Sequence, residues 1–289
     1  MKINTVNWHK YMALPAFVLF SVFFLFPLLR GILLSLTSWD GFSRPVYIGL
    51  GNFIRFFSDK RALNDVKITL LFALGSAPLL NIAGLALALL LHTSFRARNI
   101  VRGLVYLPAV ISPMIMGSVW YLLLQPERGL FYIWLEKMSV EPGNWMLNAH
   151  TALVLIILVN VWQYAGMTMI IYLAGLQSIP GEIYEAASVE GAGRVYTFRY
   201  ITLPQLFPSI RINVITNIIG SLSVFDIILA LTDGGPGYAT ESLSIYIMRM
   251  CYGNKTGYST AVAIILFVII LLPVLFTFKG LNKVGSSYE

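Results

Sequence analysis

Apolar residues occur in six long runs along the chain, and polar and charged residues gather in the segments between them. A helix needs about 20 mostly apolar residues to cross the hydrocarbon core of a bilayer, and each run is of that order. The runs do not alternate polar and apolar positions as the strands of a membrane barrel do. The pattern therefore predicts an all-α, polytopic membrane protein with a single transmembrane domain over residues 1–289. The six predicted spans cover residues 12–36, 68–91, 104–124, 151–173, 212–231 and 259–278.

The first run allows a second interpretation, because Lys2 and Lys10 precede it as the basic region of a signal peptide would. The run is longer than the apolar region of a signal peptide and lacks a small-residue cleavage site. It also contains Pro15 and Pro27. We interpret it as a retained first span.

Composition supports the membrane interpretation. Hydrophobic residues make up 57% of the chain and charged residues 11%, against about 45–50% and about 25% in a typical soluble domain. A soluble monomer of this size has too little interior to bury so much apolar surface, and a disordered chain would have far fewer aliphatic residues. The single cysteine, Cys251, excludes a disulfide framework. The cations behind the net charge of +7 lie between the apolar runs, and we expect no nucleic-acid partner.

The positive charges do not orient the predicted bundle. An even number of spans places both termini on one side, and the 20 lysine and arginine residues divide equally between the two sides. The loop at residues 92–103 holds three arginines and weakly favours cytoplasmic termini. The orientation therefore needs another argument.

Catalytic chemistry is not expected in this chain. It contains no phosphate-binding loop of the G-x-x-x-x-G-K-[ST] type and no nucleophile-elbow serine. The histidines His9, His92 and His150 are far apart and make no metal-ligand set. Asp226 is the acidic residue inside a predicted span, and no acid, histidine or lysine in the other spans could pair with it. We interpret Asp226 as a structural hydrogen-bonding residue near the interface rather than a proton relay.

The segment at residues 174–211 predicts two short helices outside the membrane. Ser178 and Pro180 are typical of a helix start, and Gly191 is typical of a helix end. A second short helix is expected to stop before Pro204. One face of the first helix is expected to carry Ile183, Ala186, Ala187 and Glu190.

These residues carry a resemblance. Glu185-Ala186-Ala187, followed at fixed spacing by Gly191 and Leu203-Pro204, is similar to the EAA loop of permeases of binding-protein-dependent ABC importers. The Gly234-Gly235-Pro236 segment and its flanks resemble the loop after the fifth span in carbohydrate-uptake permeases of the maltose and glycerol-phosphate type, and Gly49–Phe53 adds a shorter match. The resemblance covers nearly the whole chain and indicates the first of two paired permeases. Two departures are Glu190 in place of the usual Asp and Asp233 in place of a common Gly.

The resemblance implies a set of partners and an orientation. It implies a heterodimer with a second permease, two ATPase subunits that bind ATP and Mg, and an extracytoplasmic substrate-binding protein. It also implies a bacterial cytoplasmic (inner) membrane location with both termini and the coupling loop at 174–211 in the cytoplasm, a carbohydrate substrate and no cofactor in this chain. The residues expected to contact the ATPase are Glu185, Ala186, Ala187, Glu190 and Gly191. The alternative is that Glu185 and Gly191 are only cap residues of a surface loop.

Polar residues in spans four and five indicate a path for the solute. Asn213, Asn217 and Ser221 recur every four residues and so share a helix face. Amide groups bind hydroxyl groups, and tyrosine offers a face to a sugar ring. The resemblance aligns sugar-contacting positions with Asn160, Gln163, Tyr164, Met167, Asn217 and Ser221. The alternative is that these side chains hydrogen-bond between helices of the bundle.

Two other functions were weighed. An ion-coupled secondary transporter of a small polar solute would need ion ligands near the midplane and internal repeats, and neither is evident. A membrane-embedded enzyme would need a polar catalytic cluster, and only Asp226 is available in the spans. The sequence therefore favours a permease half of an ATP-driven importer, with an oligosaccharide or related polyol as its substrate.

Overall fold

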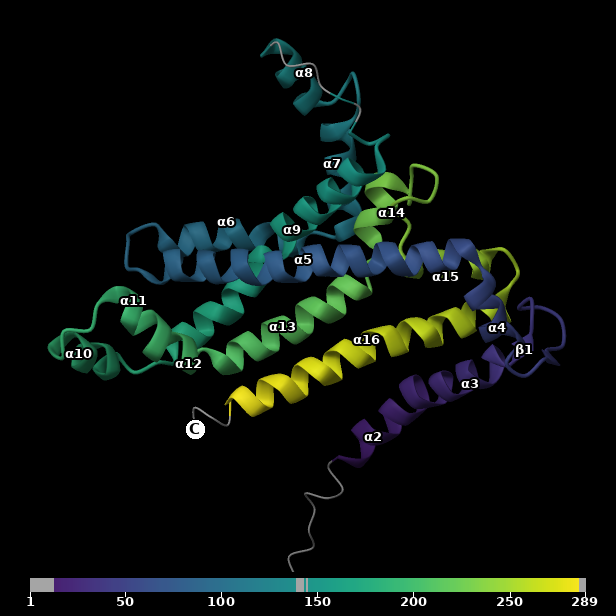
Figure 1. Cartoon of the computed structure of the whole chain (residues 1–289), viewed down its shortest axis with the longest axis horizontal. Coiled ribbons are helices and arrows are strands. Elements are labelled where there is room, and N and C mark those ends of the chain that lie inside the picture. Colours follow the sequence, from purple (N-terminus) through teal and green to yellow (C-terminus); the bar gives the residue numbers. More distant parts are fainter. Residues whose placement is uncertain (1–12, 139–142, 144, 286–289) are drawn as a thin grey trace, which may run out of the picture. The chain divides into compact units, whose positions relative to one another are not determined.

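The computed structural model describes residues 13–138, 143 and 145–285, and nearly all of their secondary structure is helical. The sheet among these residues joins β1 (Thr37–Ser38) to β2 (Val46–Tyr47) as an antiparallel pair. The predicted all-α membrane class is therefore confirmed (Figure 1). The chain divides into two compact units, one of Met1–Lys60 with Tyr246–Leu266 and one of Arg61–Ile245 with Phe267–Glu289.

Six segments of the described residues account for the six apolar runs. Four are long, apolar helical segments: Leu14–Ser35, α5 (Lys60–His92), α9 (Ala149–Gln177) and most of α16 (Thr256–Gly285). Two are bent pairs, namely α6 (Arg98–Val110) with α7 (Pro113–Leu124), bent by 96°, and α13 (Phe207–Leu222) with α14 (Asp226–Thr232), bent by 45°. Four of the described helical segments can cross a membrane, or six if each bent pair is one span.

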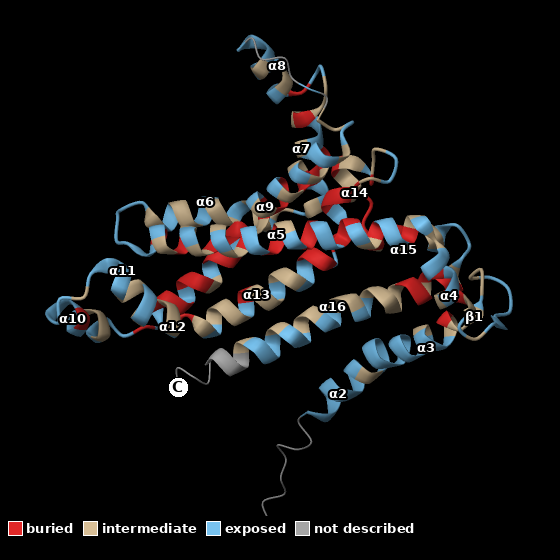
Figure 2. Cartoon of the chain, in the orientation of Figure 1, coloured by how far each residue is buried: buried red, intermediate tan, exposed pale blue. Residues whose placement is uncertain are grey.

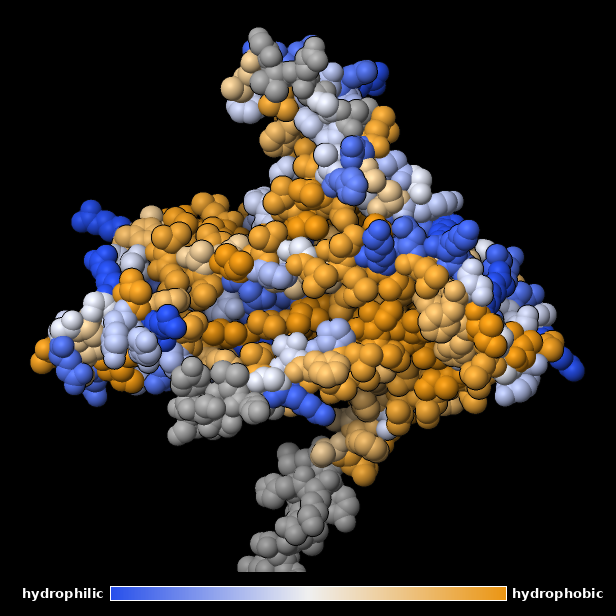
Figure 3. Space-filling view, viewed as in Figure 1, coloured by the Kyte–Doolittle hydropathy of each residue, from blue (hydrophilic) through white to orange (hydrophobic). Residues whose placement is uncertain are grey.

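The surface of these helices fits a lipid environment. In Leu14–Ser35 no residue before Ser35 is buried, and all of its phenylalanines and most of its leucines are exposed. On the face of the molecule drawn in Figure 3, apolar side chains cover most of the helical surface, and hydrophilic ones lie mainly at the loops. Because lipid tails are as apolar as these side chains, such exposure carries no cost in a bilayer.

Two π-turns make room for prolines. Leu14–Ser35 consists of α2 (Leu14–Phe20), the π-turn η1 (Ser21–Leu25) and α3 (Phe26–Ser35). A second π-turn, η2 (Phe198–Thr202), joins α11 (Arg194–Thr197) to α12 (Leu203–Gln205). The second residue after each π-turn is a proline, which removes a donor and crowds the carbonyl four positions earlier. The wider turn relieves that crowding. The prediction that the second short helix stops before Pro204 is wrong for this reason.

The smaller unit is held by polar contacts around α4 (Gly51–Ser58). The Asn52 amide donates to the carbonyl oxygens of Ser35 and Thr37, each at 2.8 Å. The Tyr246 and Tyr258 hydroxyls donate to Asp59 Oδ2 at 2.6 Å and 3.2 Å. Tyr246 belongs to α15 (Leu243–Tyr252). These bonds link the chain after the first span to the helices that follow the Gly-Gly-Pro segment.

In the larger unit, α9 packs against α6, α13 and α14, and buried residues concentrate along α5 and α9 (Figure 2). Glycines set these contacts. A Cβ placed on Gly166 of α9 would lie 2.2 Å from the Val105 carbonyl oxygen of α6, and one on Gly84 of α5 would lie 2.5 Å from Thr168. The helices therefore meet backbone to side chain or backbone to backbone at these points.

The close approach at Gly166 gives a testable prediction. Gly166→Ala should destabilise the protein by about 1–3 kcal/mol or more, because the Val105 backbone cannot move aside as a side chain would. The matched control is Gly103→Ala in α6, where a Cβ meets nothing within 4 Å. Thermal unfolding in detergent measures both variants. Equal melting temperatures for the two variants would contradict the packing described for α6 and α9.

Candidate functional site

A cavity of about 380 Å³ lies among α5, α7, α9, α13, α14 and the 223–225 junction. Most polar residues of its wall come from α9 and α13, and the junction and the start of α14 add Ser223 and Asp226. The polar lining residues are Asn160, Tyr164, Thr168, Asn213, Thr216, Asn217, Ser221, Ser223 and Asp226. The other lining residues are Leu80, Pro113, Met167, Ile171, Gly220, Val224, Phe225 and Ile227.

The cavity lies beside both bent pairs. A helix break in a membrane frees backbone groups, which need partners within the protein or in water. At the α6–α7 break the Gln163 amide donates to the Ile111 carbonyl oxygen at 3.2 Å. At the α13–α14 break the Ser242 hydroxyl donates to the Val224 carbonyl oxygen at 2.8 Å. Side chains from elsewhere in the fold thus stabilise both breaks.

Several lining residues also bind neighbouring helices. The Asn160 amide donates to Ser76 Oγ of α5 at 2.7 Å, and the Asn213 amide donates to the Thr168 carbonyl oxygen at 3.2 Å. The Asn217 amide donates to Thr168 Oγ1 at 3.3 Å. Interhelical bonding and cavity lining are therefore not exclusive, because one amide group serves both.

Two polar atoms at the cavity are left over. Asn213 Oδ1 and Ser221 Oγ are buried and accept or donate no hydrogen bond among the described residues. A buried polar atom without a partner is costly unless water or a ligand reaches it. Both atoms belong to residues of the cavity wall, which therefore has hydrogen-bonding capacity that the described part of the chain does not use.

The predicted substrate residues divide into two groups. Asn160, Tyr164, Met167, Asn217 and Ser221 all line the cavity. Gln163 does not line it, since its side chain is fully buried at the α6–α7 break. The cavity also includes Asn213, Thr168 and Thr216, of which Asn213 has the four-residue spacing that the sequence displays.

Asp226 also differs from expectation. It lies in the first turn of α14. Its carboxylate, which we predicted to form a structural hydrogen bond, has no hydrogen-bond partner in the described part of the chain. The side chain is exposed within the wall of the cavity, and its charge acts on Tyr164. The structural bond near the interface is therefore not found.

The helix α10 (Gly181–Val189) carries the Glu185-Ala186-Ala187 motif. It begins at Gly181, so the prediction that Ser178 starts it is wrong; the Ser178 hydroxyl donates back to the Gly175 carbonyl oxygen at 2.8 Å and ends α9. Gly191 ends α10 at φ +79°, and the Ala192 N–H donates to the Ala187 carbonyl oxygen, as in a Schellman motif.

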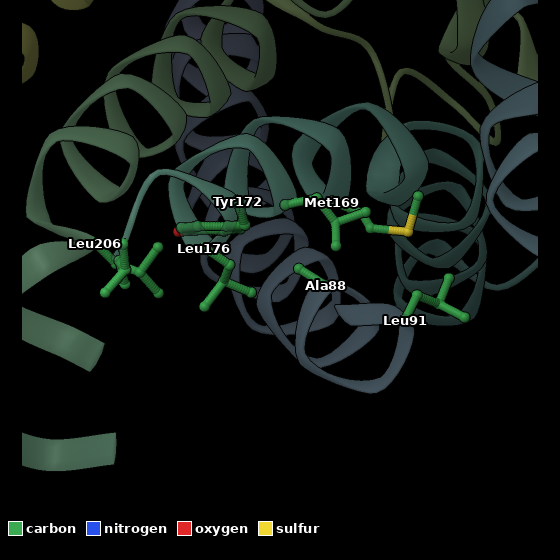
Figure 4. Close-up of a cluster of buried hydrophobic side chains, with 8 residues drawn as sticks. Ala88, Leu91, Met169, Tyr172, Leu176 and Leu206 are labelled. Carbon is green, nitrogen blue, oxygen red and sulfur yellow. The ribbon is translucent and has the colours of Figure 1, made fainter. Parts of the chain in front are cut away.

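The inward side of α10 holds two of the four residues that the sequence places on one face. Ile183 and Ala187 pack inward together with Tyr184, whereas Ala186 and Glu190 are exposed. The Tyr184 hydroxyl lies 3.2 Å from Thr202 Oγ1. Ile183 and Tyr184 contact a cluster of buried side chains from α5 and α9 and from Leu206, which Figure 4 shows. The outward face carries Glu182, Glu185, Ala186 and Val189.

The loop between α14 and α15 is fixed by a buried ion pair. Arg61 of α5 binds both carboxylate oxygens of fully buried Glu241, at 2.8 Å and 2.9 Å, and its guanidinium lies 3.6 Å from the ring centre of Tyr238. Asp65, also fully buried, interacts electrostatically with Glu241. The Thr240 hydroxyl donates to the Gly235 carbonyl oxygen at 2.6 Å. The Gly-Gly-Pro segment is therefore held to the end of α5.

Comparison with known proteins decides the family. Residues 81–281 match the family model described as binding-protein-dependent transport system inner membrane component. The chain belongs to this family. Membership of a family of transport-system membrane components confirms that the chain is a permease and not an enzyme, and it argues against the ion-coupled secondary transporter.

This permease is similar to named relatives. It is 34% identical over 267 residues to the trehalose/maltose transport system permease protein MalF of Thermococcus litoralis, covering 90% of this chain and 88% of the relative. A bacterial ABC transporter that imports the acidic polysaccharide alginate matches with a TM-score of 0.83 at 28% identity, over 96% of each chain. A bacterial alginate transporter in complex with a periplasmic protein that binds an alginate pentasaccharide matches with a TM-score of 0.84 at 25% identity, again over 96% of each chain.

The buried ion pair of the permease gives a second prediction. Arg61→Met should lower the free energy of unfolding by about 3–5 kcal/mol, because it leaves the carboxylate of Glu241 buried without its guanidinium partner. The side chain of Arg61 is 28% exposed, which places the loss at the lower end. Thermal unfolding of the purified protein measures it.

The control is Lys60→Met, which removes a neighbouring exposed cation. Adding Glu241→Gln to Arg61→Met should recover part of the lost stability, because one buried charge is then removed. An Arg61→Met variant as stable as Lys60→Met would contradict the assignment.

Proposed function

We propose that this chain is a transmembrane permease subunit of a binding-protein-dependent ABC importer for a carbohydrate, and that it forms half of the translocation path. The polar cavity beside two bent spans, in a chain of this permease family, carries the proposal. Such a cavity offers a hydrophilic solute hydrogen-bonding partners inside a lipid-facing bundle.

The chemistry of the cavity supports a carbohydrate. Its wall presents the amides of Asn160 and Asn217, the hydroxyl of Ser221 and the ring of Tyr164. Amides and hydroxyls both donate to and accept from sugar hydroxyls, and an aromatic face suits the apolar face of a sugar ring. The named relatives are a trehalose/maltose permease and an alginate importer, and both act on carbohydrates.

The outward face of α10 is the proposed contact with a cytoplasmic ATPase subunit, which binds ATP and Mg. Val189 is 89% exposed on the same helix as the exposed carboxylates of Glu182 and Glu185, and Val195 of α11 is 81% exposed. Exposed apolar side chains clustered with charges are typical of a protein interface. Because the opposite face of α10 packs against α5 and α9, movement of the partner would be passed to the helices around the cavity.

The remaining partners follow from this assignment. A second permease subunit would complete the translocation path, and a second ATPase subunit would bind that permease. In the proposed orientation, both termini and the α10 segment lie on the cytoplasmic side of the bacterial inner membrane. The loop at residues 232–243 and the segment Gly49–Phe57 would then meet an extracytoplasmic substrate-binding protein.

Copurification and transport together test the proposal. The full chain should copurify with a second permease and an ATPase subunit, and proteoliposomes of the complex should take up sugar only with ATP and an added binding protein. Uptake by the chain alone, without ATP, would refute the proposal.

The coupling role of the α10 segment gives a further prediction. Gly191→Val should reduce ATP-driven uptake at least tenfold, because a β-branched residue at φ +79° distorts the turn after α10. Gly193→Val is the matched control, since Gly193 has an extended backbone and a Cβ there meets nothing within 4 Å. Uptake is measured at equal amounts of membrane-inserted protein. Equal uptake by the two variants would separate α10 from energy coupling.

A further inference from the structure

Asp226 is an acid in a wall that otherwise lacks charge. It lines the cavity at the start of α14, directly after the 223–225 junction. No lysine, arginine or histidine is among the residues that line the cavity. The carboxylate is exposed to the cavity, and no hydrogen bond holds it within the described part of the chain. Its hydrogen-bonding capacity is therefore available to an occupant.

The groups near Asp226 are those that a polyhydroxylated molecule would meet. The charge of Asp226 acts on Tyr164, and Ser221, five residues earlier near the end of α13, has an unpaired hydroxyl. Asn213 adds an unpaired amide oxygen farther along the same wall. An ionised carboxylate accepts hydrogen bonds only, and it forms stronger ones than a neutral acceptor. Two adjacent sugar hydroxyls can donate to its two oxygens.

The same carboxylate disfavours an anionic occupant. A uronate or phosphate group in this cavity would meet a like charge in a partly dehydrated site, and no cation on this wall would offset the repulsion. An uncharged saccharide meets no such opposition. The wall of this subunit therefore discriminates by charge as well as by hydrogen bonding.

We propose that Asp226 is a substrate-contacting residue that accepts hydrogen bonds from the hydroxyls of a neutral saccharide and excludes anionic saccharides. This inference rests on the proposed function and narrows its substrate class. It separates this chain from the similar transporter whose described substrate, alginate, is acidic.

The first test uses the unaltered complex with its binding protein. Binding of neutral probes (maltose, trehalose and lactose) is compared with that of anionic probes (a diuronate and a sugar phosphate). The cognate binding protein should prefer a neutral probe, and ATP-driven uptake of that probe into proteoliposomes should follow. A tighter-binding anionic probe that is also taken up would overturn the inference. Because this test needs no variant, it decides even if a substituted chain fails to assemble.

The second test uses Asp226→Asn, which keeps the size of the side chain and removes its charge. Apparent affinity for the neutral probe in uptake should fall about tenfold or more, while copurification with the ATPase is kept. The matched control is Glu136→Gln, the same chemical change on the exposed helix α8 (Leu130–Lys137), which does not line the cavity. Uptake by Asp226→Asn equal to that by Glu136→Gln would overturn the inference.

A proton-relay role is separated by one further measurement. Wild-type uptake should be unchanged when a protonophore collapses the pH gradient, because ATP and not protons drives it. Loss of uptake under these conditions would show that a proton gradient drives transport, and it would overturn the inference. Absence of binding-protein-dependent, ATP-driven uptake by the wild type would instead refute the proposed function, before any variant is compared.

Discussion

The larger unit depends on the need of every polar group in an apolar bundle for a partner inside the protein. The helix α9 provides these partners to several helices at once. Its Asn160 amide binds Ser76 of α5, its Gln163 amide binds the carbonyl freed at the α6–α7 break, and the Thr168 backbone receives Asn213 of α13. Since an unpaired polar group in hydrocarbon costs several kcal/mol, these bonds determine how the helices surround the cavity.

Closely packed helices and bent spans differ in how readily they can move relative to their neighbours. Gly84 and Gly166 bring α5 and α6 so near to α9 that sliding between them would meet backbone or branched side chains. The bends at residues 111–112 and 223–225 interrupt the hydrogen bonding along their helices, and a side chain from elsewhere binds a freed carbonyl at each. Movement at the bends would therefore break fewer close contacts than sliding of α5 or α6 along α9.

Features that depend on length and composition, such as the apolar spans, could be predicted from the sequence. Helix bends and the directions in which side chains point could not. Six apolar runs were found because bilayer thickness sets their length, and Pro113 marks the α6–α7 break. No proline or glycine pair marks the bend at 223–225, and Pro204 alone does not show whether the helix stops there or continues through a π-turn. Spacing could not decide whether Gln163 faces the cavity or the neighbouring backbone, because both choices lie on one helix face. Periodicity also did not show which side of α10 packs inward, where Ile183, Tyr184 and Ala187 lie.

The unpaired polar atoms of the cavity wall also bear on the membrane as an insulator. Polar side chains take the place of apolar ones along the cavity wall, so the apolar barrier is thinner where the spans bend. The potential difference across the bilayer is then concentrated at the closed end of the translocation path. An importer built in this way must keep one end sealed at every stage of its cycle. Each brief failure of that seal would dissipate the ion gradients on which the cell depends.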